Sequence, residues 1–218
     1  TKQRATKRII NDEYSKDNPQ DFALWKAWDD EDGKVFWESP WGRGRPGWHI
    51  ECSAMSIKYL GNHFDIHCGG VDNIFPHHEN ELAQSVSATK GLFVNYWMHS
   101  EYLHIQGDKM SKTLGNYHKI SDLISEGFTA EEIRFTLLSA HYRSKLNFSL
   151  NQNQEARTAI KRITDIQQRL FELKDSAQTE SPMPDEFEEF VAALDDDLDT
   201  PKAFAIFFGW IRSMNNLL

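Results

Sequence analysis

The sequence contains little cysteine and no long hydrophobic run. Only two cysteines, Cys52 and Cys68, occur in 218 residues, and a small secreted domain built on disulfides would carry more. The longest apolar run, Ala203 to Ile211, contains Gly209 and is too short to cross a bilayer. We therefore expect no membrane association and a reducing, cytoplasmic compartment, in which one or both thiols are free to bind a metal.

A net positive charge is also absent. The formal net charge is −9, which excludes nonspecific nucleic-acid binding by the chain as a whole, although a local basic face can still bind RNA. The composition is 39% hydrophobic, with seven Trp and fourteen Phe, and this suffices for one large domain or two small ones. Residues 1–8 are basic but precede no apolar segment, so they are not a secretory signal. Because an initiator Met is lacking, we expect the chain to begin within a longer protein.

The first half of the chain has the pattern of an α/β nucleotide-binding fold. A loop rich in Pro and Gly precedes apolar residues at helical spacing. A short β-rich stretch closed by Gly69-Gly70 then precedes a helix that Pro76 opens. A strand, a glycine pair and a helix in this order favour that architecture. The predicted loop, helix, strand and helix cover residues 39–47, 48–60, 64–67 and 77–87.

The second half is predicted to be mostly helical. An aromatic, β-rich stretch over 94–104 and a polar loop over 107–115 come first. Thr129 and Glu132 form a capping box at the start of a helix, and a later segment has the apolar stripe of a long amphipathic helix. Helices are predicted over 120–125, 129–139, 152–174 and 186–218, the last broken at 195–201, with a linker over 179–185.

Three residues form a candidate zinc set. His77 and Glu81 are four residues apart on a predicted helix, which places both side chains on one face. Cys52 lies near the start of another predicted helix, and a thiolate, an imidazole and a carboxylate are plausible zinc ligands together. From the residues alone, His78 could replace His77 and Glu79 could compete with Glu81. A buried Cys beside a surface His–Glu pair is the structural alternative.

A cationic loop is the second candidate. Lys109 and Lys112 lie three residues apart, with Ser111 between them and Gly115 behind. Two lysines in a flexible loop suit a polyphosphate whose charge increases during phosphoryl chemistry. A solvated basic turn is the structural alternative.

The residues of this loop resemble a family signature. Lys109 to Thr113 resembles the KMSKS motif of class I aminoacyl-tRNA synthetases, and several longer segments are similar to cysteinyl-tRNA synthetases. The resemblance implies an α/β fold: the second half of a Rossmann-like class I catalytic domain, followed by an α-helical bundle. The similar segments are WESPWGRGRPGWHIECSAM (37–55), FDIHCGGVDNIFPHHENELAQS (64–85), NYWMH (95–99), HYRS (141–144) and DDDLDTP (195–201). The implied divisions are a linker or tail of an insertion domain (1–20), a catalytic half with the zinc ligands (21–95), a KMSKS-loop connecting region (96–150) and the start of a helical tRNA-binding region (151–218).

The resemblance also implies roles for individual residues. Cys52, His77 and Glu81 correspond to three zinc ligands of the family, which selects His77 over His78. Trp48 would flank the bound cysteine, and Gly70 and Asp72 would meet the adenosine ribose. Lys112 would contact ATP phosphate, and Lys109 would support the same catalytic loop.

Three departures from the family pattern stand out. Thr113 replaces the usual final Ser of the signature but keeps a hydroxyl, so a small effect is expected. Cys68 stands where the family usually has Gly and is expected to be a small buried residue without a zinc role. The N-terminal half of the family, with a fourth zinc ligand (a Cys) and the HIGH motif, has no counterpart in these residues.

The function implied by the resemblance is that of a cysteine–tRNA ligase. It would use ATP with Mg²⁺, cysteine and tRNA(Cys), with one zinc ion per chain selecting the substrate thiol. Two alternatives remain: a cysteine ligase of the same fold that acts on an amino sugar, and a noncatalytic zinc-containing module that binds nucleotide or RNA.

Overall fold

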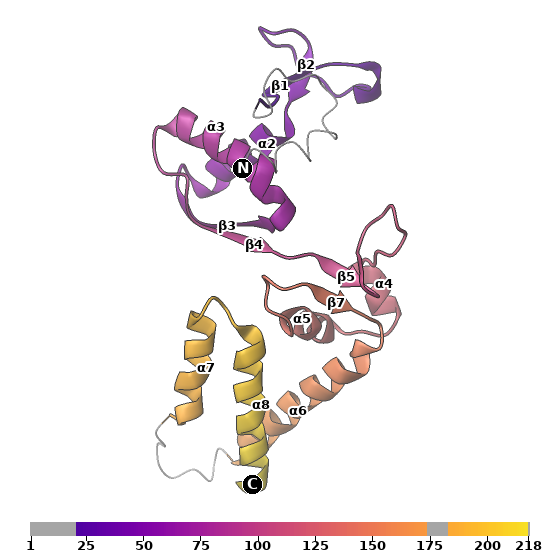
Figure 1. Cartoon of the computed structure of the whole chain (residues 1–218), viewed down its shortest axis with the longest axis vertical. Helices are drawn as coiled ribbons and strands as arrows, with labels where there is room; N and C mark the ends of the chain where they lie inside the picture. The colour runs from indigo at the N-terminus through magenta and orange to yellow at the C-terminus, as the bar shows by residue number, and fades with distance from the viewer. Residues whose placement is uncertain (1–20, 174–182, 218) are drawn as a thin grey trace. The chain divides into compact units, whose positions relative to one another are not determined.

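The structure is a computed structural model that describes residues 21–173 and 183–217 (Figure 1). The linker predicted over 1–20, and most of the one predicted over 179–185, lie outside these residues. The chain divides into two compact units, one ending at Ser100 and the other beginning at Glu101. Each unit is described by itself.

A parallel β–α–β arrangement forms the centre of the first unit. Strand β3 (Phe64–Gly70) pairs in parallel with β4 (Val94–Ser100), and helix α3 (Glu79–Thr89) lies in the connection between them. Helix α2 (Trp48–Leu60), predicted from its apolar spacing, packs against α3 (Figure 1). Phe93, fully buried, packs edge-to-face on Phe64 at the start of β3. The α/β pattern predicted for this half is therefore confirmed.

Three predicted boundaries in this unit are wrong. The loop predicted over 39–47 contains strand β2 (Gly44–Pro46), which pairs antiparallel with β1 (Trp25–Ala27). Strand β3 continues through the glycine pair that was expected to close it. The helix predicted from His77 begins at Glu79, because Phe75, directly before a proline, has an extended backbone (φ −140°, ψ 131°) that proline favours at the preceding residue.

Glycine allows the close approach of β1 and β2. A Cβ atom on Gly44 would lie 2.1 Å from the carbonyl oxygen of Lys26, so the strands could not pair at this distance with a larger residue. The hairpin pairing joins segments about 20 residues apart, and local sequence patterns do not report such contacts.

The second unit is built around a small three-stranded sheet. Strand β5 (Leu103–Ile105) pairs antiparallel with β6 (Asp108–Lys109) and parallel with β7 (Leu146–Phe148). The loop predicted over 107–115 therefore includes a strand. Gln106 and Gly107 both have positive φ, as a tight two-residue hairpin turn requires. The sheet packs with helices α4 (Ile120–Ser125) and α5 (Ala130–Leu138) around a buried core of Ile105, Leu123, Phe128, Ile133 and Phe148.

Three further helices complete this unit. Helix α6 (Gln152–Leu173) has the predicted amphipathic pattern, and α7 (Asp185–Asp195) packs beside α8 (Thr200–Leu217) (Figure 1). The break predicted at 195–201 is shorter, because Pro201 lies in the first turn of α8, where a missing N–H costs nothing. Over 21–173 and 183–217, every helix is too short or too polar to cross a membrane.

The predicted capping box at α5 is confirmed and leads to a stability prediction. The Glu132 N–H donates to Thr129 Oγ1 (3.2 Å), and the Thr129 N–H donates to Glu132 Oε2 (2.9 Å). Replacing Thr129 with Ala should lower the free energy of unfolding by about 1 kcal/mol, because a helix-terminal N–H loses its acceptor. Denaturant unfolding measures this change.

A threonine that caps no helix provides the control. The Thr164 hydroxyl on α6 donates to carbonyls of its own helix, so Thr164→Ala should change the free energy of unfolding by less than about 0.5 kcal/mol. Equal destabilisation by the two substitutions would contradict the role of the cap.

Candidate functional site

The structure brings the three predicted metal ligands together in the first unit. The ligand atoms of Cys52, His77 and Glu81 lie within 4.8 Å of one another. Cys52 comes from α2, and Glu81 from the first turn of α3. His77 lies in the π-type turn Ile74–His78 before α3. The side chains of His77 and Glu81 are therefore brought together across a turn rather than along one regular helix.

Glu81 is the most confined residue of this group. Its exposed fraction is 0%, and among the described residues neither carboxylate oxygen accepts a hydrogen bond of good geometry. His77 Nε2 lies 2.6 Å from Oε1, and His67 Nε2 lies 2.9 Å from Oε2. A buried carboxylate is costly unless a cation or a proton compensates it. This group of side chains is therefore suited to a cation.

Burial favours the neutral forms of the two neighbouring ligands, Cys52 and His77. Burial raises the pKa of the Cys52 thiol, and the Glu81 carboxylate adds to the increase. Burial lowers the pKa of His77, although Glu81 opposes the shift. His77 Nδ1 lies 2.7 Å from His49 Nδ1, so a neutral His77 can keep one nitrogen in this contact and offer the other as a ligand. A metal would displace the proton of the thiol.

A second group of ligand atoms shares Glu81. His67, His78 and Glu81 also lie within 4.8 Å of one another. Burial lowers the pKa of His78 to about 4, with the charge of His67 as a further cause, and His78 Nδ1 lies 2.8 Å from His99 Nε2. Glu79, the other alternative from the sequence, is exposed and belongs to neither group. Only the first group contains a thiol.

Gly69 leaves the space that His78 occupies. A Cβ atom at position 69 would lie 2.6 Å from His78 Cε1, and the buried ring has little room to move. Gly69→Ala should therefore lower the free energy of unfolding by about 1–3 kcal/mol through overpacking. Gly91→Ala is the matched control, because a Cβ there meets no atom of the described residues within 4 Å. The idea fails if thermal unfolding shows the two variants to be equally stable.

Trp48 lies beside His77, and the other predicted residues of this unit, Gly70 and Asp72, lie at the carboxyl end of β3. Trp48, the first residue of α2, is 58% exposed, and its ring centroid is 4.2 Å from that of His77. Asp72 follows the carboxyl end of β3, where ligands bind in open α/β sheets. A Cβ on Gly70 would lie 2.5 Å from Asp72 Oδ1, so the glycine admits this carboxylate.

Cys68 is exposed rather than buried, which corrects the sequence-based expectation. It lies on β3, where side chains alternate between the two faces, next to the half-buried His67. Cys68 belongs to neither ligand group among the described residues.

The lysine loop belongs to the second unit and is anchored at both ends. Met110 packs against the buried core. The Asn116 side chain accepts a hydrogen bond from the Ser111 N–H (2.8 Å) and donates to the Lys109 carbonyl (3.3 Å). Lys109 Nζ lies 3.5 Å from the centre of the Tyr102 ring. Lys112 is exposed, so the loop presents this cation to solvent from a fixed base.

Sequence reasoning missed several of these supporting residues. The roles of His67 and His49 depend on contacts across 14 and 28 residues, which no local pattern reports. Asn116, directly after the left-handed Gly115 (φ 67°), was a detectable signal, because Asn side chains in turns commonly bond the nearby backbone.

Comparison with known proteins identifies the family. The family model described as tRNA synthetases class I (C) catalytic domain matches residues 1–158. The chain belongs to this family of class I tRNA synthetases. A DALR domain model matches residues 189–218, so the predicted synthetase fold with a helical C-terminal part is confirmed.

Curated relatives support membership of the class I synthetase family. The chain is 48% identical over 220 residues to the cysteine–tRNA ligase of Brachyspira hyodysenteriae, covering 97% of this chain and 46% of that protein. It is 50% identical over 221 residues to the cysteine–tRNA ligase of Chlamydia muridarum, covering 99% and 46%. The chain spans about half the length of the curated relatives it matches.

A solved synthetase structure has a similar fold. The crystal structure of the ternary complex of Agrobacterium radiobacter K84 agnB2 LeuRS, tRNA and LeuAMS superposes with a TM-score of 0.64 at 14% identity. The match covers 83% of this chain and 29% of that one. At this identity, the similarity supports the class I synthetase fold alone.

Proposed function

We propose that this chain is part of a cysteine–tRNA ligase, which activates cysteine with ATP and transfers it to tRNA(Cys). Relatives of that name match almost the whole chain at 48% and 50% identity. The observation that carries the proposal is the buried Glu81 carboxylate, which makes no well-aligned hydrogen bond among the described residues and lies within 4.8 Å of the ligand atoms of Cys52 and His77. An enzyme that must recognise a thiol has a use for a metal held in this way.

Zinc is the metal that fits these ligands. Cys52, His77 and Glu81 offer sulfur, nitrogen and oxygen, which are the ligand types of zinc sites. The family resemblance implies a fourth zinc ligand, a Cys that lies outside these residues. Bound zinc would offer a position that a substrate thiolate fills well and a serine hydroxyl fills poorly. A purely apolar pocket would separate such similar side chains only about 10- to 200-fold.

The other residues of the first unit position the substrates. Trp48 presents an exposed ring beside His77 and flanks the cysteine side chain. The Asp72 carboxylate, close over Gly70, accepts hydrogen bonds from the adenosine ribose. Both groups act by holding the cysteine carboxylate near the α-phosphate, and orientation of this kind lowers the barrier of a two-substrate reaction.

The lysine loop acts on the phosphates. A cysteine carboxylate oxygen attacks the α-phosphorus of ATP·Mg²⁺, and the bond to the bridging oxygen breaks to give cysteinyl-adenylate and pyrophosphate. Lys112, supported by Lys109, neutralises the negative charge that develops on the leaving pyrophosphate. The terminal ribose hydroxyl of tRNA then takes the acyl group and releases AMP. No step requires a nucleophile from the protein.

The compartment follows from the thiols. Both cysteines are free, and a metal-binding thiol persists in a reducing compartment. We propose a cytoplasmic location on this ground.

Cysteine-dependent exchange of pyrophosphate into ATP tests the proposal. The protein expressed from its full coding sequence and loaded with zinc should exchange with cysteine more than about 200-fold faster than with serine, and should charge tRNA(Cys). Exchange with cysteine and transfer to an amino sugar but not to tRNA would favour the related ligase. Equal exchange with serine, or no exchange, would contradict the proposed function.

A further inference from the structure

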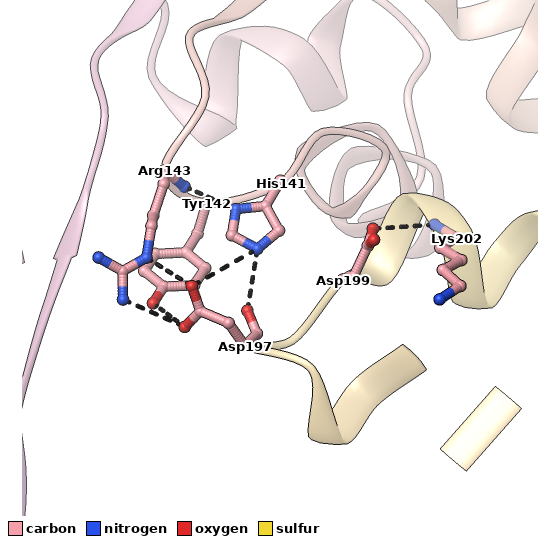
Figure 2. A network of polar contacts seen from close by, with 6 residues as sticks. All are labelled: His141, Tyr142, Arg143, Asp197, Asp199 and Lys202. Carbon is pink, nitrogen blue, oxygen red and sulfur yellow. Dashed lines mark hydrogen bonds and ion pairs between the residues drawn. The ribbon is translucent and has the colours of Figure 1, made fainter. Parts of the chain in front are cut away.

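The turn between α7 and α8 is held by three consecutive residues that follow α5. Asp197, in the middle of this turn, faces His141, Tyr142 and Arg143 (Figure 2). The segment HYRS (141–144) and the segment DDDLDTP (195–201) each resemble the cysteinyl-tRNA synthetase family, and the proposed chemistry uses neither. Their contact gives both segments a common role.

Asp197 is contacted through both its carboxylate and its backbone carbonyl. Tyr142 Oη donates to its Oδ1 (2.5 Å), and Arg143 donates through Nε to Oδ2 (2.5 Å) and through a terminal nitrogen to Oδ1 (3.2 Å). His141 Nε2 lies 2.9 Å from the Asp197 carbonyl oxygen. Arg143 and then Tyr142 lower the pKa of Asp197, and Asp197 raises the pKa of Tyr142. At neutral pH the carboxylate is therefore ionised and the phenol keeps its proton.

The backbone of the turn needs this support. Asp197 and Leu198 have consecutive positive φ angles of 55° and 59°. The left-handed region is unfavourable for residues other than glycine, and it persists where surrounding contacts hold it. The Lys202 N–H donates to Asp199 (Figure 2), and Thr200 Oγ1 donates to the Leu138 carbonyl at the end of α5 (2.7 Å). These bonds fix the start of α8.

Tyr142, which bonds Asp197, is also connected to the base of the lysine loop. The Glu101 N–H donates to the Tyr142 carbonyl (2.8 Å), and the next residue, Tyr102, carries Lys109 over its ring. The loop itself has separate anchors in Met110 and Asn116. Loss of Asp197 would therefore detach the turn before α8 from Tyr142 and Arg143 and leave the lysine loop in place.

We propose that Asp197 is a positioning residue that fixes the helices α7 and α8 relative to the base of the lysine loop, and so places the tRNA for acyl transfer. This inference rests on the proposed function, because it assumes that the helical part holds tRNA while the loop holds ATP. It predicts that cysteine activation does not depend on Asp197, whereas transfer to tRNA does.

A purely structural role of the Asp197–Arg143 ion pair would predict a large loss of stability when either side chain is removed. The Asp197 and Arg143 side chains are 46% and 63% exposed, and ion pairs in contact with water contribute little to stability. The global stability should therefore change little when they are removed. A large loss of tRNA charging without unfolding would reflect positioning.

The test compares four variants in the protein expressed from its full coding sequence. Asp197→Ala and Arg143→Ala should each lower kcat/KM for tRNA charging by about 10- to 100-fold, the cost of a displacement of about 1 Å. The double variant should lose no more than the larger single loss, because both remove one contact. Asp197→Asn, which tolerates positive φ and keeps an acceptor oxygen, should recover most of the rate.

Cysteine-dependent pyrophosphate exchange without tRNA separates the two proposals. Exchange should stay within about twofold of wild type in all four variants, since loops anchored elsewhere keep their geometry. Asp165→Ala, which removes the exposed Lys161–Asp165 pair on α6, is the matched control and should leave charging unchanged. The positioning role is wrong if Asp197→Ala charges tRNA at the same rate as this control. It is also wrong if Asp197→Ala loses pyrophosphate exchange and tRNA charging equally, and in both cases the proposed function stands. If wild type fails to exchange with cysteine, the proposed function is wrong and the inference falls with it.

Discussion

Replacing Lys112 with Ala should lower cysteine-dependent pyrophosphate exchange by about 100- to 1,000-fold, the loss observed when one preorganised group that stabilises transition-state charge is removed. The reason lies in how the loop is built. Met110 packs against the core, and the Asn116 side chain bonds the backbone of Lys109 and of Ser111, so the exposed lysine can be removed without unfolding its support. The effect should therefore appear in kcat, with the melting temperature unchanged.

An exposed lysine of the same unit provides the control for this prediction. Lys145 precedes β7 and lies outside the lysine loop, so Lys145→Ala should leave pyrophosphate exchange within about twofold of wild type, as surface substitutions normally do. A Lys112→Ala variant as active as Lys145→Ala would show that the loop is a solvated basic turn.

The two cysteines should respond oppositely to substitution. Cys52→Ala should reduce bound zinc from about one ion per chain to nearly none under competition with a chelator, because a thiolate contributes much of the affinity of such sites. Cys68→Ala should keep the full zinc content, since this exposed thiol belongs to neither ligand group. Elemental analysis of the dialysed proteins measures both values.

Discrimination against serine should change together with the metal. Cys52→Ala should lose most of its exchange with cysteine and approach the low rate with serine, because no metal remains to select a thiol. His78→Ala tests the second group of ligand atoms, which shares Glu81 but lacks sulfur. Zinc lost from His78→Ala and kept in Cys52→Ala would place the ion in that second group and contradict the assignment.

The parts of the fold that depend on local sequence could be predicted. Thr129 with Glu132 marked the start of α5, because the capping hydrogen bonds join residues three positions apart. The amphipathic stripe of α6 and the apolar spacing of α2 gave both helices within a residue of their bounds. The four-residue spacing of His77 and Glu81 predicted that their side chains lie close together, as they do across an irregular turn, but this spacing left His78 open as an alternative.

The rest depends on contacts between distant segments. His67 reaches Glu81 from β3, and Asp197 reaches Arg143 across 54 residues. No periodicity in one segment predicts which other segment it will meet. The exposure of Cys68 was mispredicted for a related reason, since the face of β3 that it occupies is decided by pairing with β4 and by the position of α3.

Location of the zinc ion by anomalous diffraction at the zinc edge tests the central claim most directly. We predict one anomalous peak per chain, bound by Cys52 Sγ at about 2.3 Å and by His77 and Glu81 at about 2.0–2.2 Å. A peak between His67, His78 and Glu81, or no peak in crystals of zinc-loaded protein, would contradict the proposed thiol-selecting site.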